Sequence, residues 1–149
     1  MIRKDCIFCK IVRGELPSYK IYEDENHLAI LDIYPQTKGQ TLIITKKHYP
    51  SDPFKLPDKV LSNLILTSKK VAKMIEKSLK PKRIFLVIEG MEIDHIHVKL
   101  YPKYKIERSI ENKNFVYDEV YHGYLTTLHG PKAKDEELKK IVEKIKKRK

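Results

Sequence analysis

Residues 93–101 have the alternating sequence IDHIHVKLY. Three apolar side chains occupy one face of a strand built from it: Ile96, Val98 and Leu100. Three nitrogen-bearing side chains occupy the other face, about 6.6 Å apart along the strand: His95, His97 and Lys99. A neutral imidazole can attack phosphorus, and a neighbouring ammonium can stabilise a phosphoryl group. The stretch therefore predicts a strand with a phosphoryl-transfer site, against the alternative of ordinary surface histidines.

The sequence on either side of this strand predicts an α+β fold. Four further strands are expected over residues 19–22, 28–33, 41–45 and 83–88. A short helix is expected over residues 5–13, a long amphipathic helix over 57–79 and a terminal helix over 134–147. Because the strands follow one another closely, we expect a single antiparallel five-stranded sheet.

The length and composition favour one reduced, water-soluble domain over residues 1–149. The longest apolar run, residues 84–88, is far shorter than the about 20 residues of a membrane-spanning helix. The N-terminus has no apolar segment typical of a secretory signal, so we expect a cytoplasmic protein without membrane contact. Abundant Lys and Glu with few Asn and Gln indicate a thermophilic source.

The net charge of +11 indicates attraction to anions such as nucleotides, phosphates or nucleic acid. Residues 132–149 contain nine basic and four acidic side chains, so this terminal segment carries +5 of the total. Only five of the 31 basic residues are Arg, whereas specific nucleic-acid recognition depends strongly on Arg. A solvated lysine surface is therefore favoured for the tail, and nucleic acid is the less favoured partner.

The pair Cys6-x-x-Cys9 has three interpretations when taken alone. It could be redox active, half of a metal site, or two small core residues. No βαβ pattern surrounds the pair, which disfavours a thioredoxin-like role.

The histidine strand resembles the signature His-φ-His-φ-His-φ-φ of the histidine triad (HIT) superfamily, where φ is apolar. The resemblance extends to residues 6–49, CIFCKIVRGELPSYKIYEDENHLAILDIYPQTKGQTLIITKKHY. It covers a core of about residues 5–104 and leaves 105–149 as a C-terminal extension. It implies the HIT-like fold and the zinc-containing prokaryotic-type branch of the superfamily.

The resemblance also implies an enzymatic mechanism. The expected activity is a nucleotide hydrolase or transferase acting on a purine nucleoside phosphoramidate or a dinucleoside polyphosphate. His97 is then the nucleophile that forms a nucleotidyl-histidine, with His95 and Lys99 as its catalytic neighbours. Asp32 holds the ribose hydroxyls, and Gly90 belongs to the loop near the phosphate. The purine base is expected to bind an apolar slot formed by Ile7, Phe8, Ile11, Ile30 and Ile33.

Three positions depart from the family pattern. Lys99 replaces the third histidine, Met91 replaces a glutamine that contacts phosphate, and Gln40 replaces a common histidine. Two alternative functions stay open, the first of them because of these departures. One is a catalytically weak nucleotide-binding or interaction protein on the same fold. The other, suggested by the basic tail, removes adenylate from a nucleic-acid 5′ end.

Two further expectations come from the resemblance. One is a structural zinc ion bound by Cys6, Cys9, His48 and His95. The other is a homodimer that pairs through the long helix and the strand at residues 83–88. The segment at residues 121–131 is a candidate for substrate contact, although the resemblance assigns no role to its histidines, His122 and His129.

Overall fold

A five-stranded antiparallel sheet organises the computed structural model, which describes residues 3, 5–105 and 129–147. Its strands are β1 (Lys20–Glu23), β2 (His27–Leu31), β3 (Thr41–Thr45), β4 (Arg83–Val87) and β5 (His97–Lys103). Their order across the sheet is β1-β2-β3-β5-β4, and every neighbouring pair is antiparallel. The prediction of an α+β fold with this sheet is confirmed.

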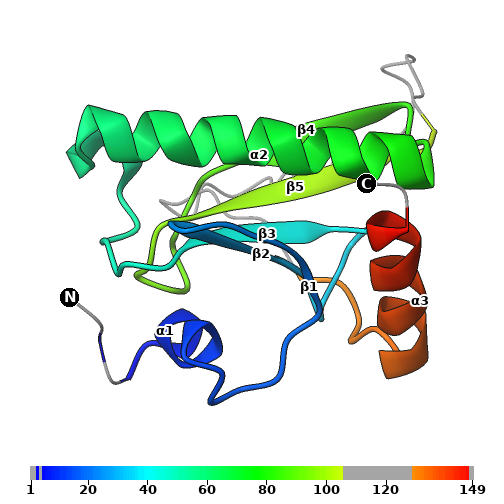
Figure 1. The fold of residues 1–149 in the computed structure, drawn as a ribbon, viewed down its shortest axis with the longest axis horizontal. Coiled ribbons are helices and arrows are strands. Elements are labelled where there is room, and N and C mark those ends of the chain that lie inside the picture. Colours follow the sequence, from blue (N-terminus) through cyan, green and yellow to red (C-terminus); the bar gives the residue numbers. More distant parts are fainter. Residues whose placement is uncertain (1–2, 4, 106–128, 148–149) are drawn as a thin grey trace, which may run out of the picture.

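Helices cover both faces of the sheet. The long helix α2 (Asp58–Leu79) runs along one face, and α1 (Ile7–Val12) lies on the other side of the molecule (Figure 1). The helix α3 (Asp135–Lys146) packs against α2 and β1 at one end of the sheet, and a short 3-10 helix (Pro53–Lys55) precedes α2. Within residues 5–105 and 129–147, no helix combines the length and the apolar character needed to cross a membrane.

Two apolar clusters pack against the two faces of the sheet. The larger cluster joins α2 and α3 to the sheet, and it includes Ile43, Leu64, Val71, Ile75, Val98, Leu100 and Ile141. The smaller cluster lies under α1 and is formed by Phe8, Leu28, Ile30 and Ile44. Adjacent residues such as Ile43 and Ile44 belong to different clusters because strand side chains alternate between faces.

The polar face of β5 is buried under the α1 side of the sheet. His97 lies opposite Ile44, and Lys99 lies opposite Leu42 in the β3–β5 pairing. His97 is 5% exposed and Lys99 is 7% exposed. The alternative of ordinary surface histidines is therefore wrong for His97, because α1 and its apolar cluster cover this face.

The predicted strand over residues 93–101 begins four residues later than expected, at His97. The His95 N–H donates to the Ile93 carbonyl (2.7 Å), and the Ile96 N–H donates to the Tyr49 carbonyl (3.0 Å). Asp94 accepts a hydrogen bond from the Ser51 N–H (2.9 Å). These contacts bend the chain before β5, so the prediction that His95 continues one strand row with His97 is wrong.

The loop after β4 is shaped by Gly90, which has a positive φ of 64°. A Cβ atom on Gly90 would lie 2.2 Å from the Ser51 Cβ. Gly14 also has a positive φ, of 77°, but a Cβ there would meet nothing within 4 Å. Both glycines therefore adopt a left-handed backbone conformation that disfavours a side chain. Only at Gly90 would a side chain also clash with a neighbour.

We predict that Gly90→Ala lowers the free energy of unfolding more than Gly14→Ala does. Both variants place a Cβ on a left-handed backbone, but Gly90→Ala adds overpacking, which costs about 1–3 kcal/mol more. Urea unfolding of both variants measures the difference. Equal losses in the two variants would contradict the packing at Gly90.

Candidate active site and metal site

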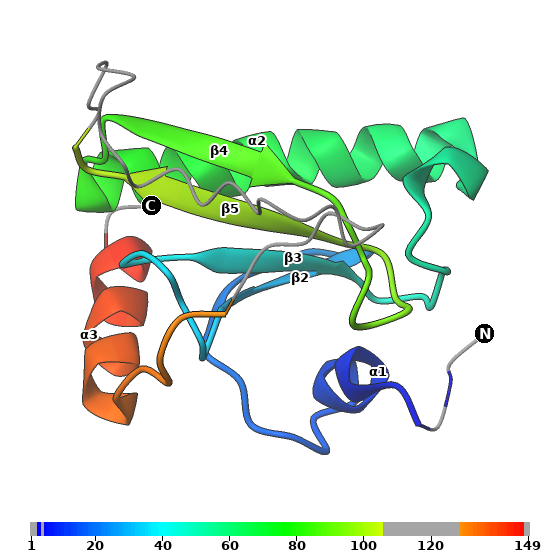
Figure 2. The same ribbon diagram turned by 180° about the vertical axis from the view of Figure 1, so that it is seen from behind.

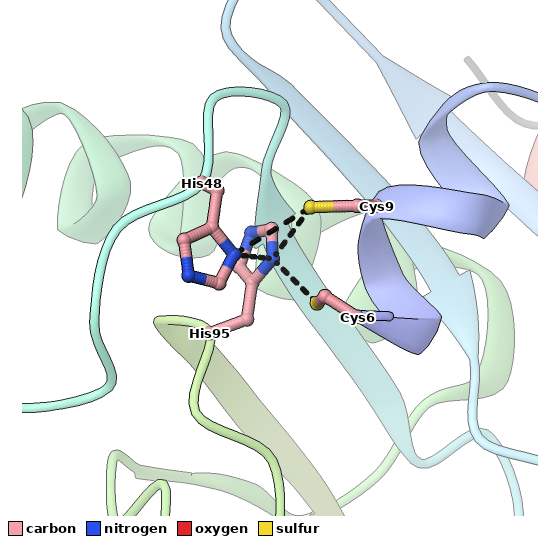
Figure 3. Close-up of side chains that lie close together, drawn as sticks. All are labelled: Cys6, Cys9, His48 and His95. Atoms are coloured by element: carbon pink, nitrogen blue, oxygen red, sulfur yellow. Dashed lines mark hydrogen bonds between the residues drawn. The ribbon is translucent and has the colours of Figure 1, made fainter. Parts of the chain in front are cut away.

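Four potential metal ligands from three segments converge beside the start of β5 (Figure 3). Cys6 and Cys9 come from α1 and its N-terminal end, His48 follows β3, and His95 precedes β5. The His95 Nδ1 lies 3.3 Å from the Cys6 Sγ and 3.7 Å from the Cys9 Sγ. The His48 Nδ1 lies 3.5 Å from the Cys9 Sγ and 3.2 Å from the His95 Nδ1. All four ligand atoms lie within 4.8 Å of one another.

These distances fit a tetrahedral metal centre. Metal–sulfur bonds of about 2.3 Å and metal–nitrogen bonds of about 2.0–2.1 Å place S and N about 3.5–3.6 Å apart and two N atoms about 3.3–3.4 Å apart. The contacts observed among Cys6, Cys9, His48 and His95 scatter closely around these values. The four residues expected from the sequence are therefore positioned to bind a metal ion.

The protonation of His95 also suits metal binding. Its Nε2–H donates to the Thr45 carbonyl (2.8 Å), so its Nδ1 directs a lone pair into the cluster. Burial lowers the pKa of His95 to about 4, and burial also lowers the pKa of His48. Both imidazoles are thus neutral near pH 7, as metal ligation requires. Burial raises the pKa of the Cys9 thiol, so its thiolate needs a bound cation for stabilisation.

Burial keeps the His97 imidazole neutral, and a backbone carbonyl sets its tautomer. Its Nδ1–H donates to the His95 carbonyl (2.7 Å), because a carbonyl can only accept. Burial lowers the pKa of His97, and the nearby Lys99 charge acts in the same direction. The Nε2 atom therefore carries the lone pair, which is the form that can act as a nucleophile.

His97 lines a cavity of about 390 Å³ between α1 and the sheet. The five apolar residues predicted for a base slot also line it: Ile7, Phe8, Ile11, Ile30 and Ile33. Asp32 and Lys99 also line this cavity. Gly90, which was also predicted to lie near the phosphate, is not part of this lining and packs against Ser51. The cavity thus combines an apolar wall with an imidazole, a carboxylate and an ammonium group.

A larger cavity of about 540 Å³ lies between residues 35–40 and α3. It shares Leu31 and Asp32 with the His97 cavity, and five lysines contribute to its described lining. His97 and Lys99 do not belong to that lining. Because it holds no candidate nucleophile, we assign the chemistry to the smaller cavity.

The Asp32 carboxylate is fixed by two hydrogen bonds. The Tyr34 N–H donates to Oδ1 (2.8 Å), and the Gln40 Nε2 donates to Oδ2 (2.7 Å). The Gln40 Oε1 in turn accepts from the Gln36 N–H (2.8 Å). Gln40 was singled out in the sequence as a departure, but its role in orienting Asp32 appears only in the structure. The remaining lone pairs of the carboxylate can accept further hydrogen bonds.

Lys99 forms a buried ion pair with Glu89, which follows β4. The Lys99 Nζ lies 2.7 Å from the Glu89 Oε1, and the two side chains are 8% and 10% exposed. Glu89 was not predicted as a site residue. The signal that could have identified it is the lysine itself, because a buried ammonium requires a carboxylate partner.

A further carboxylate and a further imidazole in the cavity lining were not assigned from the sequence. They are Glu92, in the loop before β5, and His129, in the segment before α3. His122, the other histidine of the predicted substrate-contact segment, lies outside the described residues.

Sequence comparisons identify relatives along most of the chain. The profile of the HIT domain matches residues 13–106. An uncharacterized HIT-like protein of Methanocaldococcus jannaschii is 40% identical over 124 residues, which are 77% of this chain and 95% of that protein. An adenosine 5′-monophosphoramidase of Saccharomyces cerevisiae is 37% identical over 103 residues, covering 66% of this chain and 62% of the yeast protein.

Solved structures show the same fold. A protein of Sulfolobus tokodaii described as a hypothetical histidine triad nucleotide-binding protein superposes with a TM-score of 0.76 at 26% identity, covering 95% of this chain and 90% of that one. A zinc-bound histidine triad family protein of Mycobacterium smegmatis superposes with a TM-score of 0.66 at 25% identity, covering 97% and 98%. With the matched domain, the metal-ligand cluster and the histidine strand, the chain belongs to the HIT family.

Proposed function

We propose that this protein is a nucleotide hydrolase or transferase that attacks the α-phosphate of a purine nucleoside phosphoramidate or dinucleoside polyphosphate. The observation that carries the proposal is the neutral His97, whose Nδ1–H is bound by the His95 carbonyl and whose Nε2 is available in the cavity. The relationship to an adenosine 5′-monophosphoramidase supports the same substrate class.

In the proposed mechanism, the purine binds the apolar slot under α1 and the ribose hydroxyls donate to Asp32. The Lys99 ammonium stabilises the non-bridging phosphoryl oxygens. The His97 Nε2 lone pair forms a bond to the α-phosphorus, and the bond to the leaving group breaks with its electron pair. Attack by water or another acceptor on the phosphorus then releases the nucleotide and regenerates His97.

The Lys99–Glu89 pair favours a second candidate, a nucleotide-binding protein with weak catalysis. A carboxylate 2.7 Å from the ammonium reduces the positive charge that a phosphoryl group would meet. Lysine also cannot supply the acceptor nitrogen of the imidazole that it replaces. The two candidates share ligand binding and differ in turnover.

We predict that His97→Ala reduces turnover of adenosine 5′-phosphoramidate by at least about 10³-fold, because it removes the nucleophile. AMP affinity, measured by isothermal titration, should stay close to that of the wild type. Asp32→Asn is the matched binding variant. It should weaken AMP binding about tenfold to a hundredfold by removing charge-assisted acceptors.

Unchanged turnover in His97→Ala would eliminate the covalent mechanism. A wild-type protein that binds AMP without turning over the phosphoramidate would instead establish the binding-protein candidate.

We also propose that the metal bound by Cys6, Cys9, His48 and His95 is zinc with a structural role. Two thiolates and two neutral imidazoles in a tetrahedral arrangement are a preferred zinc ligand set. The zinc-bound relative from Mycobacterium smegmatis supports this choice. Zinc would stabilise the fold by linking α1 to the segments that flank β3 and β5.

We predict one zinc ion per chain by elemental analysis, and a lower thermal midpoint after chelation, because metal binding is coupled to folding. Cys9→Ser should lose zinc and have the same lowered midpoint. Chelation should then produce little further change in this variant. Wild-type protein that is purified with zinc available and contains none would contradict the assignment.

We further propose that the protein forms a homodimer through β4 and α2. β4 is an edge strand of the described sheet, and its Phe85 and Leu86 side chains are 45% and 43% exposed. An unpaired apolar edge is prone to further strand pairing, which a second copy of the chain would satisfy.

We predict a sedimentation mass of twice 17.6 kDa at micromolar concentration. Leu86→Lys should shift the mass toward that of the single chain, since it places a charge in the proposed interface. Glu136→Lys is the control, because Glu136 is an exposed residue of α3, outside the proposed interface. A wild-type mass of 17.6 kDa would exclude the dimer.

A further inference from the structure

His129 brings the segment before α3 to the mouth of the His97 cavity. Its Nε2 lies 2.6 Å from the Glu92 Oε2, and its ring meets the Tyr34 ring edge-on with centroids 5.7 Å apart. His129, Glu92 and Tyr34 all line the cavity together with His97. The side chains of His129 and Glu92 are each 48% exposed, which places them at the solvent side of the site.

The backbone around His129 is docked onto the chain that follows β2. The Gly130 N–H donates to the Tyr34 carbonyl (3.1 Å), and the Ala133 N–H donates to the Ile33 carbonyl (2.9 Å). A Cβ on Gly130 would lie 2.1 Å from the Pro35 carbonyl oxygen, so a side chain at this position would displace the segment. The segment, orange in Figure 2, continues into α3, whose buried residues Leu138, Ile141 and Ile145 anchor it.

His129 lines the cavity at its solvent-exposed side, whereas the nucleophile His97 lies on the sheet. His97 belongs to β5 and is 5% exposed, so its Nε2 attacks from the sheet side of the cavity. In-line displacement directs the leaving group to the other side of the phosphorus, toward the mouth. Lys99 lies two residues along the same strand and therefore on the nucleophile's side. Among the described residues of the lining, His129 is the second histidine.

Building on the proposed function, we propose that His129 is a second catalytic residue that transfers protons at the leaving group. In the first step, the Nε2 of His97 bonds to phosphorus as the bond to the leaving group breaks. The leaving group takes the proton from Nδ1 of the His129 imidazolium. In the second step, water attacks phosphorus, the bond to His97 breaks, and the water proton returns to Nδ1. Glu92 is a positioning residue that accepts the His129 Nε2–H throughout.

Two substrates with the same nucleotide separate this role from a structural one. The amine of adenosine 5′-phosphoramidate needs a proton to leave, whereas the phenolate of AMP 4-nitrophenyl ester leaves without one. We predict that His129→Gln lowers kcat/KM for the phosphoramidate by about 10²–10⁴-fold and changes kcat/KM for the nitrophenyl ester little. The parameter kcat/KM reports the first step alone, because leaving-group departure is the first irreversible event.

Gly130→Ala provides a second variant that leaves the His129 side chain intact. It should show the same substrate-selective loss by displacing the segment, whereas Gly14→Ala should leave kcat/KM for both substrates unchanged. Equal losses on both substrates, or no loss on either, would overturn the role of His129. If wild-type protein consumes neither substrate, or if His97→Ala still releases nitrophenolate, the proposed function itself fails, and this inference fails with it.

Discussion

The structure of the site depends on the contacts of one residue, His95. Its Nδ1 faces the metal-ligand cluster, its Nε2–H is held by the Thr45 carbonyl, and its own carbonyl accepts the Nδ1–H of His97. The Nδ1 contact places His95 among the potential metal ligands. The Nε2–H bond holds the segment before β5 against β3. The carbonyl bond sets the tautomer of the nucleophile His97. The His95 side chain is fully buried, so neither ring nitrogen could stay unpaired without a desolvation cost.

Charge in the cavity is arranged in pairs, and each pair has a defined geometry. Lys99 is matched by Glu89, His129 by Glu92, and the Asp32 carboxylate by two N–H donors. Burying the charge of Lys99 or Asp32 alone would cost several kcal/mol, whereas a hydrogen-bonded partner offsets much of that cost. An anionic ligand would therefore enter a site whose charged groups are already oriented, which reduces the reorganisation required on binding.

Much of the fold could be predicted from the sequence because its signals are local. The apolar periodicity of residues 57–79 and 134–147 predicted helices that the structure places at 58–79 and 135–146, and β3 spans the predicted residues 41–45. The predicted start of β5 was wrong because the alternation of apolar and polar residues continues through residues 93–96. The backbone N–H groups of His95 and Ile96 instead donate to the carbonyls of Ile93 and Tyr49. The cytoplasmic location and the thermophilic source stay predictions from composition.

The sequence by itself determined the kinds of chemical group in the site. Cys6, Cys9, His48, His95, His97, Lys99 and Asp32 were all identified by residue type and motif, and the structure brings them to the metal cluster or to the cavity. The tertiary structure alone decided the partners Gln40 for Asp32 and Glu89 for Lys99, and it alone brought His129 with Glu92 to the cavity. These pairings join segments that approach only when the sheet has formed, and short-range sequence patterns do not encode distances between such segments.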